Sequence, residues 1–552
     1  MPRRRRALTE AGRSHGVTRR QLLVRGGAAA AVVGLGGTAV ALATRNGGGA
    51  DPGSGSWGAL IRTDGVAPVH ASLLPSGEVL MNGTGGGADV SDFVIDPGAT
   101  GGIHVDDLDP PMRMQQDTLF CAGHAPLPDG RMLLVGGQRS SPEQGLDYAL
   151  LFEHRGNAAI RWTPIEASIL GGPSWYPTVT RLPSGDMLVI SGFTDWGGEL
   201  NRTIQVFHPQ RLDTGRSPWS SLVPHEKVPD VSPTGADYTH VFVLPRPVVV
   251  DGHSRQVAMV GANGEVWLFN CSDRFGDPAE RFATRPNGRR PAPAKAMPGA
   301  GASSAMLADG RILIVGSGDE EGEGERSLMS RADIYDPYRD EWRSIETGIG
   351  RIYPVAILLP DGTVAIVNGD RGQGDSRTPQ IIDPDSGAVI DGPAWPDGGV
   401  RGYHNSALLV PDGRVLTASG EGGELSGRPG GPSERTDLRY YSPPYLSVVA
   451  EAERPEVVGA PRWMGYRRPY SIQVRNGPIH RVMLLAPGAM THSIDMNQRR
   501  VPLFEGEAGG GELTVNGPDD RSVAPPGDYM LFVLSEVDGV LIPSRGRMIR
   551  VG

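Results

Sequence analysis

The sequence predicts an all-β protein, a seven-bladed kelch-type β-propeller followed by a C-terminal immunoglobulin-like β-sandwich. Three observations predict this fold class. The chain is rich in turn-forming residues, with 79 glycines and 48 prolines among 552 residues. Short glycine turns recur about every fifty residues, and this period ends before the last hundred or so. So much glycine and proline argues against a helical bundle, and the Gly-X-Y period of collagen is absent.

The composition also excludes several classes of protein. A hydrophobic share of 38% argues against a disordered chain. A net charge of −10 argues against a general nucleic-acid binder, which shows a basic face, so no nucleic-acid partner is expected. The two cysteines, Cys121 and Cys271, are too few to build a disulfide scaffold. What remains is a turn-rich globular protein, expected to be a monomer.

Residues 1–45 predict an export signal. Arg19 and Arg20 stand in a Thr-Arg-Arg-Gln-Leu-Leu segment that resembles a twin-arginine signal, and an uncharged Ala/Gly/Val stretch follows them. An uncleaved membrane anchor and a disordered basic tail are the alternatives. Residues 46–56, rich in glycine and serine, predict a flexible linker. The protein is therefore expected outside the cell or in the cell envelope, with membrane or cell-wall association left open.

The propeller is predicted from seven turns that each precede a β-rich run. Their glycines are separated by 53, 55, 67, 58, 52 and 51 residues. Turn, strand, turn, strand at this period is the kelch repeat, in which each repeat forms a four-stranded blade around a central channel. A loose array of sandwiches is the alternative, but it does not explain the fixed period. The seven turn glycines are Gly77, Gly130, Gly185, Gly252, Gly310, Gly362 and Gly413.

The predicted propeller spans residues 57–446, and residues 447–552 form the second domain. The period stops after a Tyr-Tyr-Ser-Pro-Pro-Tyr-Leu segment, and short alternating strands follow it. About a hundred residues of this kind suit an immunoglobulin-like sandwich.

A candidate site is predicted on the channel. The strand before each turn is the innermost of its blade, so residues at equal offsets from the turns face the axis at similar depth. The fourth blade is longer here, which makes its count unreliable. A thiol, phenols and an imidazole at one level indicate a metal or redox site, and such donors suit Cu(II). Counting nine back from the glycines gives Pro68, Cys121, Tyr176, Val243, Gly301, Tyr353 and His404, with Tyr403 beside the last.

Several sequence motifs surround these positions and continue into the second domain. They are Thr118-Leu-Phe-Cys-Ala-Gly-His-Ala125, Trp175-Tyr-Pro-Thr-Val-Thr-Arg181, Gly402-Tyr-His-Asn-Ser406, Thr491-His-Ser-Ile-Asp-Met-Asn-Gln-Arg-Arg-Val-Pro-Leu503 and Ala524-Pro-Pro-Gly-Asp-Tyr-Met-Leu-Phe-Val533. These motifs resemble the copper radical oxidases, the family of galactose oxidase and the glyoxal oxidases. The resemblance covers about residues 57–552, without the sugar-binding domain that precedes the propeller in galactose oxidase. The Trp-Tyr-Pro form around Tyr176 is closer to the glyoxal oxidase branch.

The resemblance implies a copper ion held by Tyr176, Tyr403, His404 and His492. It also implies a thioether between Cys121 and the ring of Tyr176, which lets Tyr176 hold a radical. Tyr403 is then the base for the substrate hydroxyl proton, and the Tyr176 radical abstracts hydrogen from carbon. Because His492 lies in the second domain, a hairpin from that domain must reach into the channel.

The implied function is two-electron oxidation of a small aldehyde, a primary alcohol or a carbohydrate such as a glycan end. Dioxygen is reduced to hydrogen peroxide in the same cycle. The alternative is a catalytically silent kelch propeller that binds glycan or protein at the cell surface. A binding protein has no need for all five of the implied cofactor residues, which favours the enzyme.

Individual residues have competing interpretations. Cys121 and Cys271 form a disulfide in the alternative to the thioether. Trp196 is the candidate for the aromatic ring that the family places over the thioether. Tyr353 is expected to be channel wall. Three further histidines lie near inner strands and are expected to be core residues without a role: His70, His124 and His240.

Overall fold

A computed structural model describes residues 53–552, except for the segments given at the end of this paragraph. The predicted export signal and Trp196 therefore lie outside the described residues, as does Cys271. Within the described part of the chain, no helix has the length and apolar character needed to cross a membrane. The excepted residues are 64, 86–89, 98–109, 141, 155–159, 167, 170, 196–199, 202, 221–237, 262, 271–281, 292–300, 318–327, 371–375, 397–399 and 421–434.

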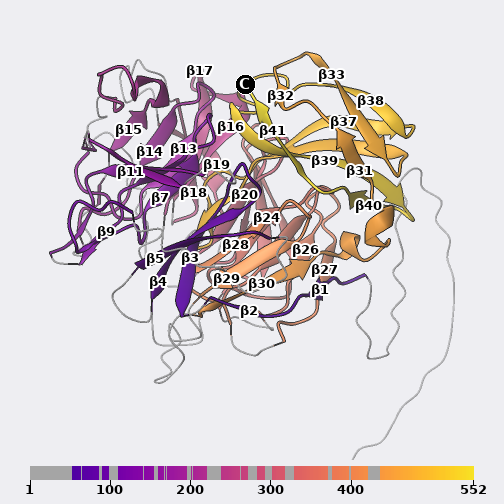
Figure 1. Ribbon diagram of the computed structural model, residues 1–552, viewed down its shortest axis with the longest axis horizontal. Coiled ribbons are helices and arrows are strands. Elements are labelled where there is room, and N and C mark those ends of the chain that lie inside the picture. The colour runs from indigo at the N-terminus through magenta and orange to yellow at the C-terminus, as the bar shows by residue number, and fades with distance from the viewer. Residues whose placement is uncertain are drawn as a thin grey trace, which may run out of the picture. The chain divides into compact units, whose positions relative to one another are not determined.

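Antiparallel sheets follow one another along the propeller, and each contains one of the predicted turns (Figure 1). Each turn joins the first strand of its sheet to the second. The described residues form seven such sheets, while the count of seven blades stays a prediction. In chain order the sheets are β3 (Val66–Leu73), β4 (Val79–Gly85) and β5 (Val90–Ile95); β7 (Gly123–Pro126), β8 (Met132–Val135), β11 (Ala149–Glu153) and β12 (Arg161–Ile165); β13 (Thr178–Arg181), β14 (Met187–Ile190) and β15 (Ile204–Phe207); β16 (His240–Val250), β17 (His253–Val260), β18 (Glu265–Phe269) and β19 (Ala283–Arg289); β20 (Ser303–Met306), β21 (Ile312–Val315), β22 (Arg331–Asp336) and β23 (Glu341–Glu346); β24 (Val355–Leu358), β25 (Val364–Val367), β26 (Gln380–Ile382) and β27 (Val389–Asp391); and β28 (Asn405–Leu409), β29 (Val415–Ser419) and β30 (Asp437–Ser442) with β1 (Ser56–Trp57) and β2 (Ile61–Arg62).

The first strands of the sheets form the inner ring. Neighbouring first strands contact one another, as β28 contacts β3, β7 contacts β13, and β24 contacts both β20 and β28. Short runs of fully buried β-branched and aliphatic residues make these strands and their partners, as in β14 and β25. The N-terminal strand β1 closes the ring by pairing with β30, where Trp57 lies opposite Tyr441.

Three shorter strands and three single 3₁₀ turns complete the described part of this region. The strands form one small sheet beside the second blade. They are β6 (Asp117–Thr118), β9 (Gln138–Ser140) and β10 (Glu143–Gly145), and the 3₁₀ turns are η1 (Pro209–Arg211), η4 (Pro444–Leu446) and η5 (Glu451–Glu453).

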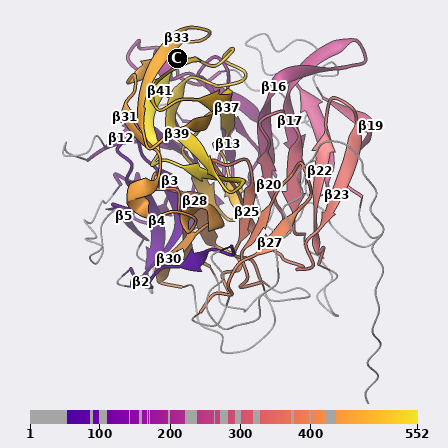
Figure 2. The ribbon, with the colours of Figure 1, turned by 90° about the vertical axis from the view of Figure 1, so that its right-hand side faces the viewer.

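The C-terminal domain is a sandwich of two sheets around its own core. Alternating residues of its strands face inward, including Ile472, Val482, Leu484 and Leu531. In Figures 1 and 2 its orange and yellow strands lie together against one side of the propeller. One sheet contains β31 (Glu456–Gly459), β33 (Pro469–Arg475) and β38 (Gly511–Asn516); the other contains β32 (Trp463–Met464), β41 (Arg547–Val551), β39 (Gly527–Val537), β34 (Ile479–Leu485), β37 (Arg500–Ala508) and β40 (Val540–Pro543).

A hairpin leaves this sandwich and enters the propeller ring. Its strands β35 (Ala489–Thr491) and β36 (Ile494–Asp495) extend the first propeller sheet, in which β35 pairs with β3. The hairpin also contacts the first strands β7, β20 and β28. It therefore lies among the innermost strands and carries His492 at its tip, between β35 and β36.

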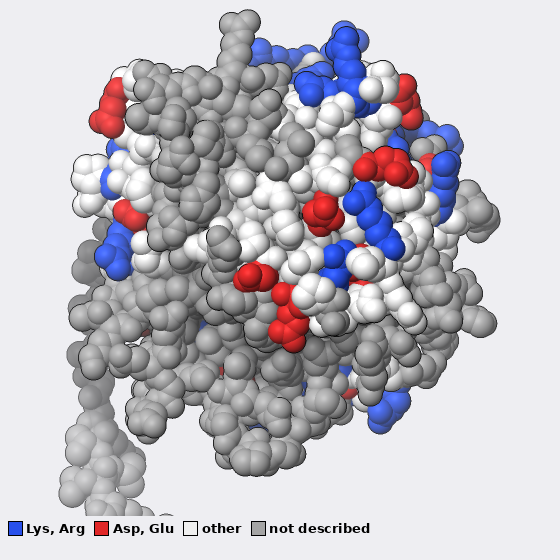
Figure 3. Space-filling model, turned by 90° about the vertical axis from the view of Figure 1, so that its left-hand side faces the viewer, with Lys and Arg blue, Asp and Glu red and all other residues white. Residues whose placement is uncertain are grey.

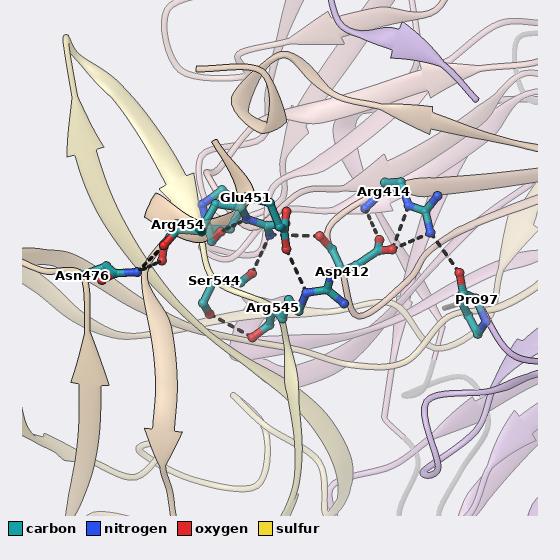
Figure 4. A network of polar contacts seen from close by, with 10 residues as sticks. Pro97, Asp412, Arg414, Glu451, Arg454, Asn476, Ser544 and Arg545 are labelled. Carbon is teal, nitrogen blue, oxygen red and sulfur yellow. Dashed lines mark hydrogen bonds and ion pairs between the residues drawn. The ribbon is translucent and has the colours of Figure 1, made fainter. Parts of the chain in front are cut away.

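Buried arginines join the two domains (Figure 4). Arg454 donates from Nε to the Pro543 carbonyl oxygen at 3.0 Å, and from Nη2 to the carbonyl oxygens of Asp412 and Ser544 at 2.9 and 3.0 Å. Its Nη1 pairs with Glu451 at 2.9 Å. Asp412 belongs to the last propeller turn and Ser544 to the sandwich, so one guanidinium ties both domains together.

A second contact between the two domains involves one of the turn glycines. Gly130 has a φ of +90°, which favours glycine, and a Cβ built there lies 2.8 Å from Arg550 and 2.9 Å from Asp528. Arg550 itself donates to the Asp129 carbonyl oxygen at 3.0 Å. The turn therefore requires glycine for its conformation, and it lies close to these two side chains of the second domain.

The described part of the surface in Figure 3 carries charges of both signs. Red and blue side chains are interspersed there, and neither sign gathers into a large patch.

Candidate metal centre

Five positions at the entry to the first strands share an uncommon backbone conformation. Cys121, Tyr176, Gly301, Tyr353 and His404 have φ values of 61°, 65°, 57°, 57° and 63°. Left-handed φ is rare for residues other than glycine and is retained where the surrounding structure enforces it. All five belong to the set counted from the turns, so the structure places these positions equivalently in their blades.

The same count fails in the first and fourth blades. Pro68 lies inside β3, and Val243 lies inside β16, where a register shift between Val243 and Val248 lengthens the strand. The residue two places before β16, as Tyr176 is before β13, is Tyr238. Counting from the start of the strand rather than from the turn identifies this residue.

The structure brings the candidate donors together. The hydroxyl oxygens of Tyr176 and Tyr403 lie 2.8 Å apart. The ring of His492 lies 4.8 Å from that of His404 and 5.1 Å from that of Tyr403, measured between centroids. Tyr176 and His492 are buried, whereas Tyr403 and His404 are partly exposed. The cluster therefore has a closed side and a side that faces outward.

His492 is oriented by its neighbour in the hairpin. Its Nδ1 lies 2.6 Å from Oγ1 of Thr491, which in turn donates to the Val69 carbonyl oxygen at 3.3 Å. Because the hydroxyl proton is used by Val69, Nδ1 of His492 is the donor and Nε2 carries the lone pair. Burial lowers the pKa of His492 well below its usual value, which keeps the ring neutral. A neutral imidazole fixed through its other nitrogen is a typical metal ligand.

The thiol of Cys121 lies against this cluster. The Sγ of Cys121 is 3.6 Å from Nε2 of His492. The backbone carbonyl oxygen of Cys121 accepts a hydrogen bond from the Tyr176 N–H at 3.0 Å. Burial, followed by the nearby Cys121 and Tyr403, raises the pKa of Tyr176 well above its usual value. Cys121 is fully buried. Cys271, its partner in the alternative disulfide, lies outside the described residues.

Aromatic rings surround Tyr176. The Trp175 ring lies at 4.9 Å with an interplanar angle of 37°, and the Tyr238 ring meets it edge-on at 5.2 Å and 76°. Tyr238 is buried and also lies 5.5 Å from the His492 ring. Neither Tyr238 nor Trp175 was predicted from the sequence as a neighbour of this ring. Trp196, the predicted neighbour, lies outside the described residues.

The other residues that the sequence places near the inner strands lie at different distances from the donor cluster. Tyr353, predicted to be channel wall, packs against Tyr403 with 5.0 Å between the ring centroids. His70 touches the cluster directly, because its Nε2 accepts the Cys121 N–H at 3.0 Å. His124 contacts Ser72 at 2.7 Å, one layer farther from the cluster. His240 bonds to Ser304 in the fourth and fifth blades, and it is buried like the others.

The residues present fit copper. Two imidazoles and two phenols form a mixed nitrogen and oxygen donor set of the kind that suits Cu(II). A buried phenol with a raised pKa keeps its proton, and a bound cation reverses that preference.

Over most of its length the chain is similar to known oxidases. Residues 454–551 match the family model "Galactose oxidase-like, Early set domain". A galactose oxidase of Gibberella zeae is 26% identical over 531 residues, covering 91% of this chain and 71% of the relative. The aldehyde oxidase GLOX of Vitis pseudoreticulata is 22% identical and covers 90% of this chain and 97% of the relative.

A solved structure shares the fold. It is described as a novel fungal alcohol oxidase with catalytic diversity among the AA5 family, in complex with copper. The TM-score is 0.69 at 22% identity, with 90% of this chain and 99% of that chain covered. Its fold agrees with the all-β propeller and the immunoglobulin-like C-terminal domain described above. These relatives and the shared fold make the chain similar to galactose oxidase and to aldehyde oxidase over most of its length, and they support the copper radical oxidase family.

Proposed function

We propose that this protein is a copper radical oxidase that oxidises a primary alcohol or an aldehyde and reduces dioxygen to hydrogen peroxide. One observation carries the proposal. Tyr176, Tyr403 and His404 of the propeller converge with His492 of the C-terminal hairpin, and the Cys121 thiol lies beside them. A silent binding module has no need for a buried hairpin that delivers a fourth donor.

The copper would be held by the two phenolate oxygens and by one nitrogen of each histidine. When bound, it supplies a one-electron acceptor and a Lewis acid. Thr491 keeps Nε2 of His492 available, because its hydroxyl oxygen accepts a hydrogen bond from the Nδ1–H group. Because Tyr403 and His404 are the partly exposed members of the cluster, substrate approaches from their side.

Tyr403 is the residue that takes the substrate hydroxyl proton. Its oxygen lies 2.8 Å from the Tyr176 oxygen, so a substrate bound at the one is adjacent to the other. The radical form of Tyr176 takes a hydrogen atom from the substrate carbon. The overall change is R–CH₂OH + O₂ → R–CHO + H₂O₂, or the equivalent oxidation of an aldehyde hydrate to an acid.

Cys121 and Tyr176 form the radical-bearing group. The proposed bond joins Sγ of Cys121 to a ring carbon of Tyr176, with loss of the thiol hydrogen and one ring hydrogen to dioxygen. The balanced change is R–SH + Ar–H + O₂ → R–S–Ar + H₂O₂. The Tyr176 N–H already donates to the Cys121 carbonyl oxygen at 3.0 Å, and this bond keeps the two side chains adjacent. Trp175 and Tyr238 then cover the ring and set its surroundings.

The proposal extends to location and substrate branch. Residues 1–45 direct export by the twin-arginine route, so the enzyme works outside the cytoplasm. The Trp-Tyr-Pro sequence around Tyr176 favours the glyoxal oxidase branch and thus an aldehyde substrate.

The test is peroxide release by the copper-loaded enzyme from glyoxal-type aldehydes, galactose and simple primary alcohols. The expected result is peroxide from at least one class, with aldehydes preferred, and its loss in Tyr403→Phe. The Tyr353→Phe variant serves as the matched control, since it removes a neighbouring phenol that is not a proposed donor. Copper-loaded enzyme that stays silent on all three classes contradicts the proposal.

A further inference from the structure

The backbone of Cys121 is held differently from that of its counterparts in other blades. At Tyr176 the N–H is donated to the carbonyl oxygen of Cys121, one blade back, at 3.0 Å. At Tyr353 the N–H is donated to the carbonyl oxygen of Gly301, again one blade back, at 2.7 Å. Two pairs of equivalent left-handed positions in the inner ring are thus linked by backbone hydrogen bonds.

At Cys121 a side chain replaces the carbonyl. The N–H of Cys121 is donated to Nε2 of His70 at 3.0 Å, and both residues are buried. The carbonyl oxygen of Pro68, the residue counted at this offset in the first blade, accepts a hydrogen bond from Ser406 instead. The position that carries the thiol therefore has a histidine ring as its acceptor, where Tyr176 and Tyr353 have a backbone carbonyl.

His70 is itself fixed by the strand that meets the hairpin. It lies in β3, where it pairs with Asn82 of β4 and with Thr491 of β35. Its ring lies 5.9 Å from the ring of His492 and 5.1 Å from that of His124. One strand thus supports both the thiol side of the cluster, through His70, and the histidine donor, through Thr491.

We propose that His70 is a positioning residue for the cofactor, which holds Cys121 in the left-handed conformation that presents its Sγ to Tyr176 and so determines how fast the thioether forms. The proposal rests on the proposed function, because it assumes the Cys121–Tyr176 bond. The acceptor must be an unprotonated Nε2, since the backbone N–H only donates. No contact of His70 with the donor oxygens is required, so copper binding is a separate property.

The experiment compares two variants of the full chain. His70→Phe keeps a ring of similar volume without an acceptor, and His70→Gln puts an amide oxygen near the position of Nε2. His240→Gln is the matched control. Like His70, His240 is a buried histidine, but it bonds to Ser304, outside the cluster. Copper is added to apoprotein under argon, its affinity is measured, and air is then admitted.

The readout is the fraction of Cys121–Tyr176 cross-linked peptide, followed over time by mass spectrometry. We expect His70→Phe to slow cross-linking at least tenfold with copper affinity within threefold of the wild type. His70→Gln should recover most of the rate, and His240→Gln should match the wild type. Circular dichroism establishes that each variant is folded, and the comparison of His70→Gln with the wild type stands if His70→Phe is not.

Two results overturn the proposal in distinguishable ways. Wild-type rates in His70→Phe, or equal slowing in His240→Gln, show that His70 has no specific effect on Cys121, while the proposed function stands. If the wild type itself forms no cross-link with copper and oxygen, the proposed function fails, and the role of His70 fails with it.

Discussion

The orientation of His492 by Thr491 gives a quantitative prediction. Thr491→Val keeps the shape of the side chain and removes the hydroxyl that accepts the Nδ1 proton at 2.6 Å. Both residues are almost fully buried, at 0% and 1% exposure, so water cannot replace the lost acceptor. An unsatisfied buried donor costs about 1–3 kcal/mol. Loss of such an orienting partner typically lowers metal affinity by about 10–100-fold.

The assay is a copper titration of apoprotein against a competing chelator at fixed pH. We expect Thr491→Val to bind copper at least tenfold more weakly, which corresponds to about 1.4 kcal/mol. Thr491→Ser is the matched control, because it retains the hydroxyl and should bind within about threefold of the wild type. Equal affinity in Thr491→Val and the wild type refutes the assignment of His492 as an oriented copper ligand.

Three further predictions concern export, acid stability and the donor set. Changing Arg19 and Arg20 to Lys should retain the protein in the cytoplasm, as measured by fractionation, because the pair is read by a receptor; normal export would favour another route. Burial lowers the pKa of His240 to about 4, so stability should fall by about 3 kcal/mol as pH drops from about 6.5 to 4, and His240→Gln should flatten this slope in urea unfolding. His492→Ala should lower copper content after desalting; unchanged content would remove the hairpin from the site.

Much of the propeller was predictable because its turns are local. Each turn glycine adopts a positive φ, and the turn-forming residues before it mark the end of the first strand in the sequence. From these turns the sequence places Cys121, Tyr176, Tyr353 and His404 correctly at equivalent positions. The count fails at Val243 because an irregularity inside β16 changes the distance between the turn and the strand start, which no local pattern marks.

The contacts that hold the cluster were not predictable from the sequence. His70 meets Cys121 across two blades, and its isolated position in an apolar strand looks like that of any core histidine. Tyr238 falls outside the count of nine residues from the turn glycine, so its place in the ring appears only in the structure. The left-handed conformation of Cys121 likewise depends on long-range contacts rather than on its own propensity.

The central claim is that Cys121 and Tyr176 become a single cofactor. Its most direct test is peptide mass spectrometry of the wild-type protein after aerobic copper loading, with Cys121→Ser as the control. The account predicts one peptide pair joined through these two residues, two hydrogens lighter than the sum of its parts and resistant to reducing agents, with no such pair in Cys121→Ser. Separate peptides, or a reducible Cys121–Cys271 disulfide, would contradict it.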